Sequence, residues 1–209
     1  MKLATEYLKN PTEETYDRVL SEEYGEYASS VKKAAFMFSN AFREFPFYVT
    51  TLYRGPQNAG PSNLLYAEPT GLDSTMTCFA FDDIEMWRSI YPLDVFREQF
   101  KKLSLIWKEG LREIENMPDC AFKDSAYAAY SVFRSSYLQI EFNMNRECEN
   151  KSLLCEIIDE ERTLAMMMYD IMQRNNSIGY EAANHYYFNK GMLIEKVLCC
   201  DYLKEKFEN

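Results

Sequence analysis

The amino-acid sequence predicts an all-α protein, an antiparallel bundle or array of about six helices that forms a single domain over residues 1–209. The first observation behind this prediction is the distribution of helix breakers, because five of the seven prolines lie between residues 46 and 92. The second is a hydrophobic repeat of three and four residues outside that stretch, which is typical of amphipathic helices.

The first helix is expected to begin in the Asn10-Pro11-Thr12 sequence and to end near Gly25. Either Asn10 or Thr12 can accept hydrogen bonds from the unpaired amides of the first turn, and Pro11 suits a first helical turn. The second helix, about 26–44, stops before Pro46 because the residue that precedes a proline avoids the helical conformation. Its predicted buried residues are Val31, Ala34, Ala35, Phe38, Ala41 and Phe42.

Four longer helices follow, over about 92–116, 119–146, 152–174 and 190–207. Pro118 ends the first of them, and the Asn175-Asn176-Ser177 sequence ends the third. The apolar face of the third is expected to consist of Leu154, Ile157, Ile158, Leu164, Ala165, Met168 and Met172. The last helix is expected to bury Leu193, Val197, Leu198, Tyr202 and Leu203.

Two segments lack helical periodicity. The first, 46–91, is a long irregular insertion between the second and third helices, and the second, 177–189, is a short polar and aromatic loop. Structureless connections of the first length are uncommon in compact domains, and functional side chains often lie on such loops. We therefore expect functional side chains in both segments.

The charge balance excludes several classes of protein. The chain has 23 basic and 33 acidic residues, a net charge of −10, and no extended basic run, which argues against nucleic acid and membrane surfaces as partners. It has no apolar run of about 18 residues and no secretory leader pattern, so we expect a soluble, cytoplasmic protein. The six scattered cysteines predict reduced, mostly buried thiols, and with one histidine they predict neither a metal site nor a cofactor.

The first irregular segment carries candidate ligand-binding residues. Amide side chains hydrogen-bond hydroxyl groups in both directions, and aromatic faces cover the apolar surface of a sugar ring, so this composition is typical of carbohydrate sites. An ordered loop that satisfies its own backbone is the alternative. The candidates are Arg54, Gln57, Asn58, Asn63, Tyr66 and Trp87.

Asp82 and Asp83 are candidate catalytic residues in the same segment. Adjacent carboxylates raise one another's pKa and can serve as a general acid and a general base. The alternative is that one of them caps a short helix.

The second irregular segment contains the only histidine, His185, four residues after Glu181. On a helical turn the carboxylate would orient the imidazole and raise its pKa, which makes the two residues candidates for a general base and its partner. A structural polar pair is the alternative. Asn184 and Tyr186 are candidate ligand-binding residues beside them.

Several segments resemble the C-terminal helical region of an uncharacterised bacterial glycoside-hydrolase-like family of the α-glucuronidase and N-acetylglucosaminidase kind. The resemblance implies a helical domain that follows a catalytic barrel, and a (β/α)₈ barrel needs about 250 residues that this chain does not contain. The segments are 10–25, Phe45-Pro46-Phe47, GPQNAGPSNLLY (55–66), WRSIYPLDVF (87–96) and IGYEAANHYYF (178–188).

Three functional hypotheses follow. The leading one is a non-catalytic helical domain that packs on an upstream barrel domain or polypeptide and contributes loops to a carbohydrate site. The second is a self-contained hydrolase that uses Glu181 and His185 with Asp82 or Asp83, which requires these side chains to converge on one pocket. The third is a helical protein–protein interaction module, whose acidic faces bind a basic partner or whose exposed aromatic residues pair two copies into a homodimer.

Overall fold

A computed structural model describes residues 2–76, 79–148, 150–181, 186–187 and 189–208. The described chain is helical, as predicted, and its only strands are two residues long. Its α-helices are α1 (Lys2–Lys9), α2 (Glu13–Tyr24), α3 (Ala28–Phe42), α4 (Val49–Arg54), α5 (Ile84–Arg88), α6 (Leu93–Arg112), α7 (Ala121–Asn145), α8 (Lys151–Arg174) and α9 (Lys190–Glu208).

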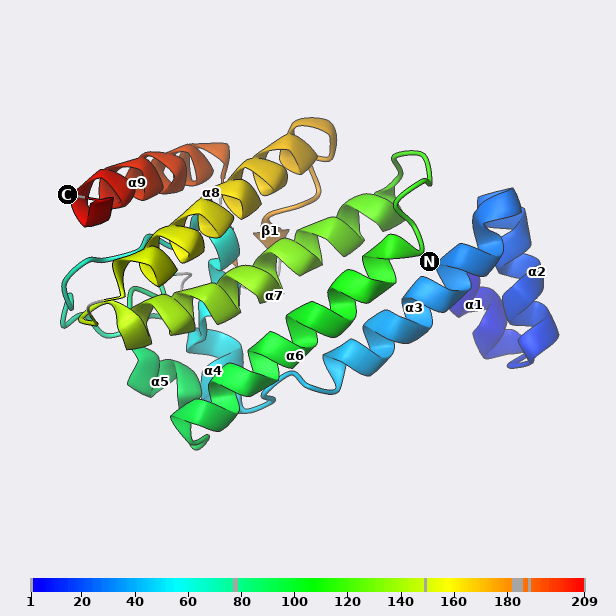
Figure 1. Ribbon diagram of the computed structural model, residues 1–209. Coiled ribbons are helices and arrows are strands. Elements are labelled where there is room, and N and C mark those ends of the chain that lie inside the picture. The colour runs from blue at the N-terminus through cyan, green and yellow to red at the C-terminus, as the bar shows by residue number, and fades with distance from the viewer. Residues whose placement is uncertain (1, 77–78, 149, 182–185, 188, 209) are drawn as a thin grey trace.

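Five long helices lie side by side in the order α3, α6, α7, α8, α9 (Figure 1). Neighbours in this array run in opposite directions (Figure 1). The helix ends agree with the predicted ones to within a few residues, because the local capping signals operate. Thr12 accepts a hydrogen bond from the Thr15 amide at 3.1 Å, and Asn150 accepts one from the Leu153 amide at 3.2 Å.

The two irregular segments contain more regular structure than predicted. Residues 46–91 include α4, α5 and two 3₁₀ helices, η2 (Pro56–Asn58) and η3 (Gly60–Ser62). Proline near the start of each 3₁₀ helix favours a tight turn. Helices of three residues are too short to show an amphipathic repeat, so the sequence pattern did not predict them. In the second segment, Tyr180–Glu181 (β1) pairs with Tyr186–Tyr187 (β2) in an antiparallel hairpin.

The core lies between the helices of the array and under η2 and η3, which pack against α7; η3 also packs against α8 and α9. Close approach of α3 and α6 depends on Gly110, because a Cβ atom there would lie 2.6 Å from the Phe38 ring. That ring stacks on Trp107 with centroids 4.4 Å apart. Small residues therefore set the distance between these two helices.

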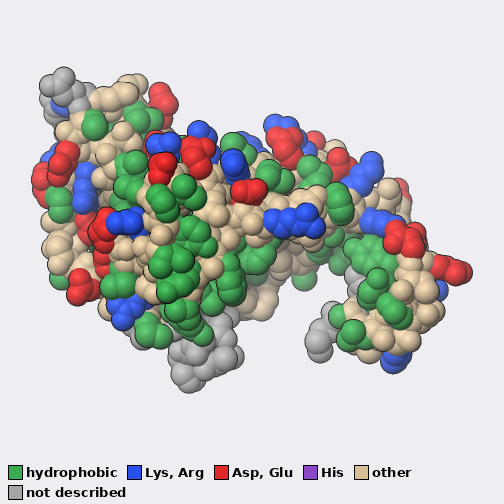
Figure 2. All heavy atoms as spheres, turned by 90° about the horizontal axis from the view of Figure 1, so that it is seen from below, with side chains coloured by type: hydrophobic (Ala, Val, Ile, Leu, Met, Phe, Trp, Pro, Cys, Tyr) green, Lys and Arg blue, Asp and Glu red, His purple; other side chains and the backbone are tan. Residues whose placement is uncertain are grey.

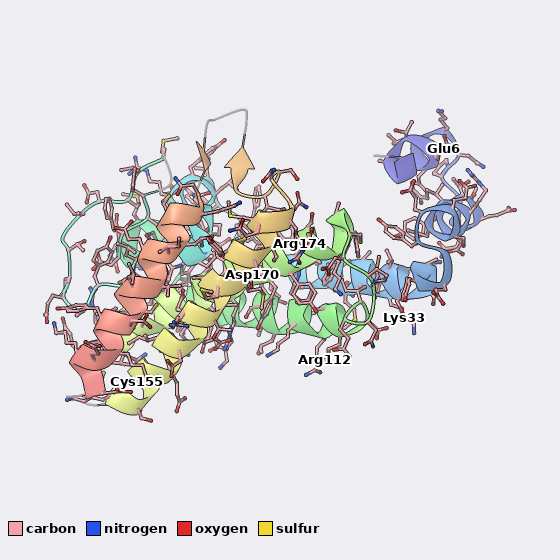
Figure 3. The ribbon with its side chains drawn as sticks, turned by 90° about the horizontal axis from the view of Figure 1, so that it is seen from above. Glu6, Lys33, Arg112, Cys155, Asp170 and Arg174 are labelled. Carbon is pink, nitrogen blue, oxygen red and sulfur yellow. The ribbon has the colours of Figure 1, made fainter. Side chains whose placement is uncertain are left out.

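The N-terminal helices form a projection that we call the arm, residues 2–24. Helix α1 was not predicted, and it packs against α2, which packs against the start of α3. Seen from above, α1 and α2 extend away from the array at the N-terminal end of α3 (Figure 3). The C-terminal end of α2 is held by Tyr24, whose ring lies 5.7 Å from that of Phe122 on α7.

Some predicted core positions are on the surface. Phe42 is 50% exposed, and Leu198 and Tyr202 are each 63% exposed, because the buried face of α9 is formed by Leu193, Lys196, Cys200 and Leu203. The prediction of mostly buried cysteines was wrong for the described residues. Cys200 is buried, Cys148 is exposed and Cys120, Cys155 and Cys199 are intermediate, all as free thiols, while Cys78 lies outside the described residues. Among the helices described, none is long and apolar enough to cross a membrane.

Candidate functional site

The amides of the first predicted site bind the protein's own backbone. Gln57 Nε2 donates to the carbonyls of Thr51 at 2.7 Å and Leu52 at 3.3 Å, and Asn58 Nδ2 donates to Leu52 at 3.1 Å. Arg54 donates to the carbonyl of Ser74 at 3.3 Å. These donors close the end of α4 and hold the chain that follows it.

Asn63 is buried and bridges two parts of the chain. Its Nδ2 atom donates to the Phe81 carbonyl at 2.7 Å and to Gln139 Oε1 at 2.8 Å. Trp87 is also buried, and its indole nitrogen donates to the Ala80 carbonyl at 2.9 Å. Both side chains therefore fix residues 80–81 against the helical array.

The two candidate carboxylates have separate roles. Asp82 pairs at 2.6 Å with Arg146, which directly follows α7, and accepts hydrogen bonds from Thr70. Asp83 caps α5 by accepting from the Met86 amide at 3.2 Å. The capping alternative therefore describes Asp83.

The remaining predicted residues divide between a pocket and the C-terminal hairpin. Tyr66 lines a small pocket together with Asn63, and burial raises the pKa of its hydroxyl. Glu181 and Tyr186 belong to β1 and β2, but their side chains lie outside the described part of the structure. Asn184 and His185 also lie outside the described residues, so the convergence of Glu181 and His185 with Asp82 or Asp83 stays a prediction.

The most unusual polar group in the interior is an ion pair that sequence reasoning missed. Lys196 on α9 and Glu161 on α8 are both fully buried, and their charged atoms lie 2.8 Å apart. Ser135 on α7 donates to both carboxylate oxygens at 2.9 Å. Burial raises the pKa of Glu161, while the ammonium of Lys196 acts in the opposite direction.

A chain of hydrogen bonds extends this ion pair to the irregular segment. Gln139 Nε2 donates to Ser135 Oγ at 2.9 Å and to the Gly60 carbonyl at 2.8 Å, and Gln139 accepts from Asn63. The Lys196 ammonium donates to the Asn63 carbonyl. The buried network, defined as Asn63, Ser135, Gln139, Glu161 and Lys196, therefore joins three helices to η3.

The sequence did contain a signal for this network. Glu161 follows Ile157 and Ile158 on the buried face of α8, and Lys196 follows Leu193 on that of α9. Charged residues of opposite sign at core positions of neighbouring helices indicate a buried pair. Because its atoms are enclosed, the network is suited to holding the fold together.

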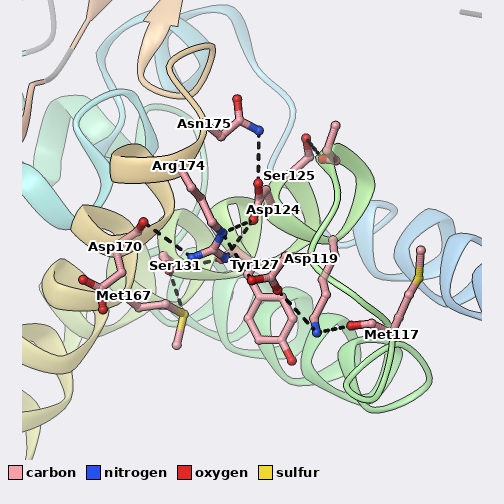
Figure 4. Close-up of polar contacts among 12 residues, drawn as sticks. Met117, Asp119, Asp124, Ser125, Tyr127, Ser131, Met167, Asp170, Arg174 and Asn175 are labelled. Carbon is pink, nitrogen blue, oxygen red and sulfur yellow. Dashed lines mark hydrogen bonds and ion pairs between the residues drawn. The ribbon is translucent and has the colours of Figure 1, made fainter.

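A second polar cluster ties the start of α7 to the end of α8 (Figure 4). Arg174 donates to the buried carboxylate of Asp124 at 2.8 Å, and Asn175 donates to the same group at 3.3 Å. A groove of about 460 Å³ lies beside it, lined by Tyr127, Met167 and neighbouring residues. The charges of this cluster are paired with one another, and their hydrogen bonds hold the end of α8 against the start of α7.

A hollow lies between the arm and α3. This arm pocket has a volume of about 680 Å³. Phe36 on its wall is 69% exposed and Tyr7 is 40% exposed, and Leu8 on α1 is 82% exposed. Its lining residues are Ala4, Tyr7, Glu13, Tyr16, Lys32, Ala35, Phe36 and Ser39.

The arm is acidic. Residues 2–24 contain six acidic and three basic side chains, a net charge of 3 − 6 = −3. At the pocket wall, Lys32 pairs with Glu13 and, at 2.6 Å, with Asp17. Seen from below, the arm forms a separate lobe that carries hydrophobic side chains, and a hollow separates it from the rest of the molecule (Figure 2). The arm pocket thus combines aromatic surface with acidic surroundings.

Comparison with known proteins gave no family model, no curated protein and no solved structure that matches this chain. The resemblance to a glycoside-hydrolase-like family therefore stays a prediction. Among the residues described, no cluster of three or more histidine, cysteine or acidic side chains has the geometry to hold a metal ion.

Proposed function

We propose that this protein is a helical protein-binding module whose arm pocket receives the apolar face of a helical segment from a partner. The observation that carries the proposal is the arm pocket, where α1, α2 and α3 leave Tyr7 and Phe36 exposed around about 680 Å³. Exposed aromatic side chains in a concave surface are typical of anchors in protein interfaces. Helix-in-groove binding uses the same combination.

The surrounding charge favours a basic partner segment. The arm carries a net charge of −3, within a chain whose net charge is −10. Complementary charge accelerates association and fixes orientation, while apolar contacts supply most of the affinity. The partner segment is therefore an amphipathic helix with basic residues beside its apolar face.

This proposal fits the geometry better than the carbohydrate hypothesis. The N–H groups of Gln57, Asn58 and Asn63 donate to groups of the protein itself, and a sugar would have to displace those bonds. Exposed surface at the arm needs no such displacement. The carbohydrate hypothesis stays a prediction that titration with oligosaccharides would test.

The test uses a synthetic helical peptide of leucine and lysine residues that has one apolar face. The control is a peptide of the same composition whose residues are rearranged so that no apolar face forms. Fluorescence anisotropy should give a dissociation constant of about 1 to 100 μM for the first peptide and much weaker binding for the second. Phe36→Ser should weaken binding about tenfold or more. Leu198→Ser, which removes a similarly exposed residue from α9, is the matched control and should leave binding unchanged.

Two results would contradict the proposal. Equal binding of both peptides would show attraction to negative charge without a groove. Equal loss of binding in the two variants would place the site away from the arm.

A further inference from the structure

A further pocket lies between the first irregular segment and α9. Its volume is about 190 Å³, enough for a small organic molecule. It shares no lining residue with the arm pocket. Its lining residues are Ala59, Ser62, Asn63, Leu64, Tyr66, Phe79, Phe81, Met192 and Glu195.

Three of these residues are aromatic. Phe79 and Phe81 stack with centroids 6.0 Å apart, and Phe79 is 54% exposed although it lines a pocket. Phe81 has a φ of +52°, which is an unfavourable backbone conformation for a bulky side chain. Such conformations persist where the surroundings enforce them and are concentrated at functional sites.

The surroundings of Phe81 do enforce its conformation. Its carbonyl accepts a hydrogen bond from Asn63 at 2.7 Å, and the carbonyl of the preceding Ala80 accepts one from Trp87 at 2.9 Å. Asn63 is fixed in turn through Gln139 and Lys196. The aromatic wall is therefore preorganised by the buried network.

The charge at this pocket is negative. Glu195 is exposed on α9 and forms no ion pair with any other residue that the structure describes. The neighbouring Asp82 is neutralised by Arg146 at 2.6 Å, and Lys196 is neutralised by Glu161 at 2.8 Å. Burial raises the pKa of Tyr66, and the carboxylates of Asp82 and Glu195 raise it further.

We propose that this pocket binds a small organic cation with an alkylated ammonium group. Aromatic faces attract such cations through their quadrupoles, and the apolar lining accommodates the methyl groups. The Glu195 carboxylate supplies the opposite charge without a competing basic partner in the described structure. The proposal does not depend on binding at the arm.

The experiment uses the full chain with carbon-13 in its methionine methyl groups, so that Met192 reports from the pocket. Choline chloride is titrated while NMR spectra are recorded, and 3,3-dimethylbutan-1-ol, its uncharged analogue of nearly equal shape, is titrated in parallel. Choline should shift the Met192 signal with a dissociation constant of about 1 mM or lower, and the alcohol should bind about tenfold more weakly. The Met192→Leu variant assigns the signal.

Two substitutions locate the binding. Phe79→Ala and Glu195→Gln should each weaken choline binding about threefold to tenfold. Both residues are exposed, so the fold should be retained. Phe47→Ala and Glu14→Gln remove an exposed ring and an exposed carboxylate elsewhere and should leave the affinity unchanged.

The outcomes decide the proposal. Charge-dependent binding that both pocket variants weaken supports it. Equal affinity for choline and the alcohol would overturn it, as would the absence of a Met192 shift at about 10 mM choline, ten times the expected dissociation constant. Undiminished binding to the Phe79→Ala variant would also overturn it.

Discussion

Two lysine–carboxylate clusters in this protein have the same chemistry and opposite surroundings. Lys196 and Glu161 lie 2.8 Å apart and are fully buried in the array. Lys32 lies 2.6 Å from Asp17 and also pairs with Glu13, but the three side chains are between 36% and 77% exposed. The first cluster is enclosed by three helices, and the second forms a wall of the open arm pocket.

The difference separates residues that hold the fold from residues that are available to a partner. A buried charge loses its hydration and must be compensated by the protein, so removal of either partner is costly. Water and salt compensate an exposed charge, so its loss has little effect on stability. We therefore expect substitutions in the buried network to act on folding and substitutions in the arm to act on binding.

The largest effect is expected for Lys196→Met. This substitution leaves the Glu161 carboxylate buried without its cation and should lower the free energy of unfolding by about 3 to 5 kcal/mol. Urea denaturation followed by circular dichroism measures it. The double variant Lys196→Met with Glu161→Leu removes both charges and should recover part of the loss. A loss below about 1 kcal/mol for the single variant would break the comparison.

Gly110→Ala tests the contact between α6 and α3, the helix that carries the arm. The added Cβ would lie 2.6 and 2.8 Å from atoms of the Phe38 ring and would force it from its stack on Trp107. We expect a loss of about 2 to 3 kcal/mol in urea denaturation. Gly191→Ala, whose nearest contact is Asn189 Oδ1 at 3.1 Å, is the control and should cost less. Equal effects would indicate that helix spacing does not depend on Gly110.

Asp82 gives a smaller and pH-dependent effect. Burial alone would raise the pKa of Asp82, but hydrogen bonds from Thr70 and Arg146 lower it below its ordinary value of 3.8. The folded state therefore binds this proton more weakly than the unfolded state, and the stabilisation is present above pH 3.8 and lost as the pH falls through the lowered value.

The corresponding variant is Asp82→Asn. It should be less stable than the wild type by about 1 to 2 kcal/mol at pH 6, because the amide keeps one acceptor. The difference should shrink as the pH falls below about 4. Urea titrations at several pH values would reveal it, and a difference that grew in acid would contradict the assigned sign.

The helices could be predicted from the sequence because capping residues and amphipathic repeats are local features of the chain. Thr12 and Gly25 mark the ends of α2, and all seven predicted apolar positions of α8 are buried. Those positions are Leu154, Ile157, Ile158, Leu164, Ala165, Met168 and Met172. Amphipathic repeats of this length determine both the helix and its buried face.

The candidate sites were less accessible because they depend on contacts between distant residues. Gln57 and Asn63 have the composition of a ligand site, but folding brings backbone carbonyls and Gln139 within hydrogen-bonding distance of them. The face of α9 was misassigned for the same reason, since Lys196 is buried by a partner that lies 35 positions earlier in the sequence. Helix α1 was not predicted because its eight residues make only about two turns, too few for a helical repeat to be recognised.

The smallest effect on stability, and a measurable one on binding, is expected for Lys32→Met. Hydrogen bonds to Asp17 and Glu13 raise the pKa of Lys32, but the side chain is solvated. The midpoints of urea denaturation should therefore be the same for the variant and the wild type, both at low salt and at about 1 M NaCl. Removal of this cation makes the arm pocket more acidic. The amphipathic lysine–leucine peptide should therefore bind about two- to threefold more tightly at low ionic strength, and the gain should vanish in high salt.

Lys204→Met, which exposes Asp159 on α8 instead, is the matched control and should not change peptide affinity. A loss of stability close to that of Lys196→Met would remove the distinction between the two clusters, because it would mean that the arm depends on its ion pairs for folding.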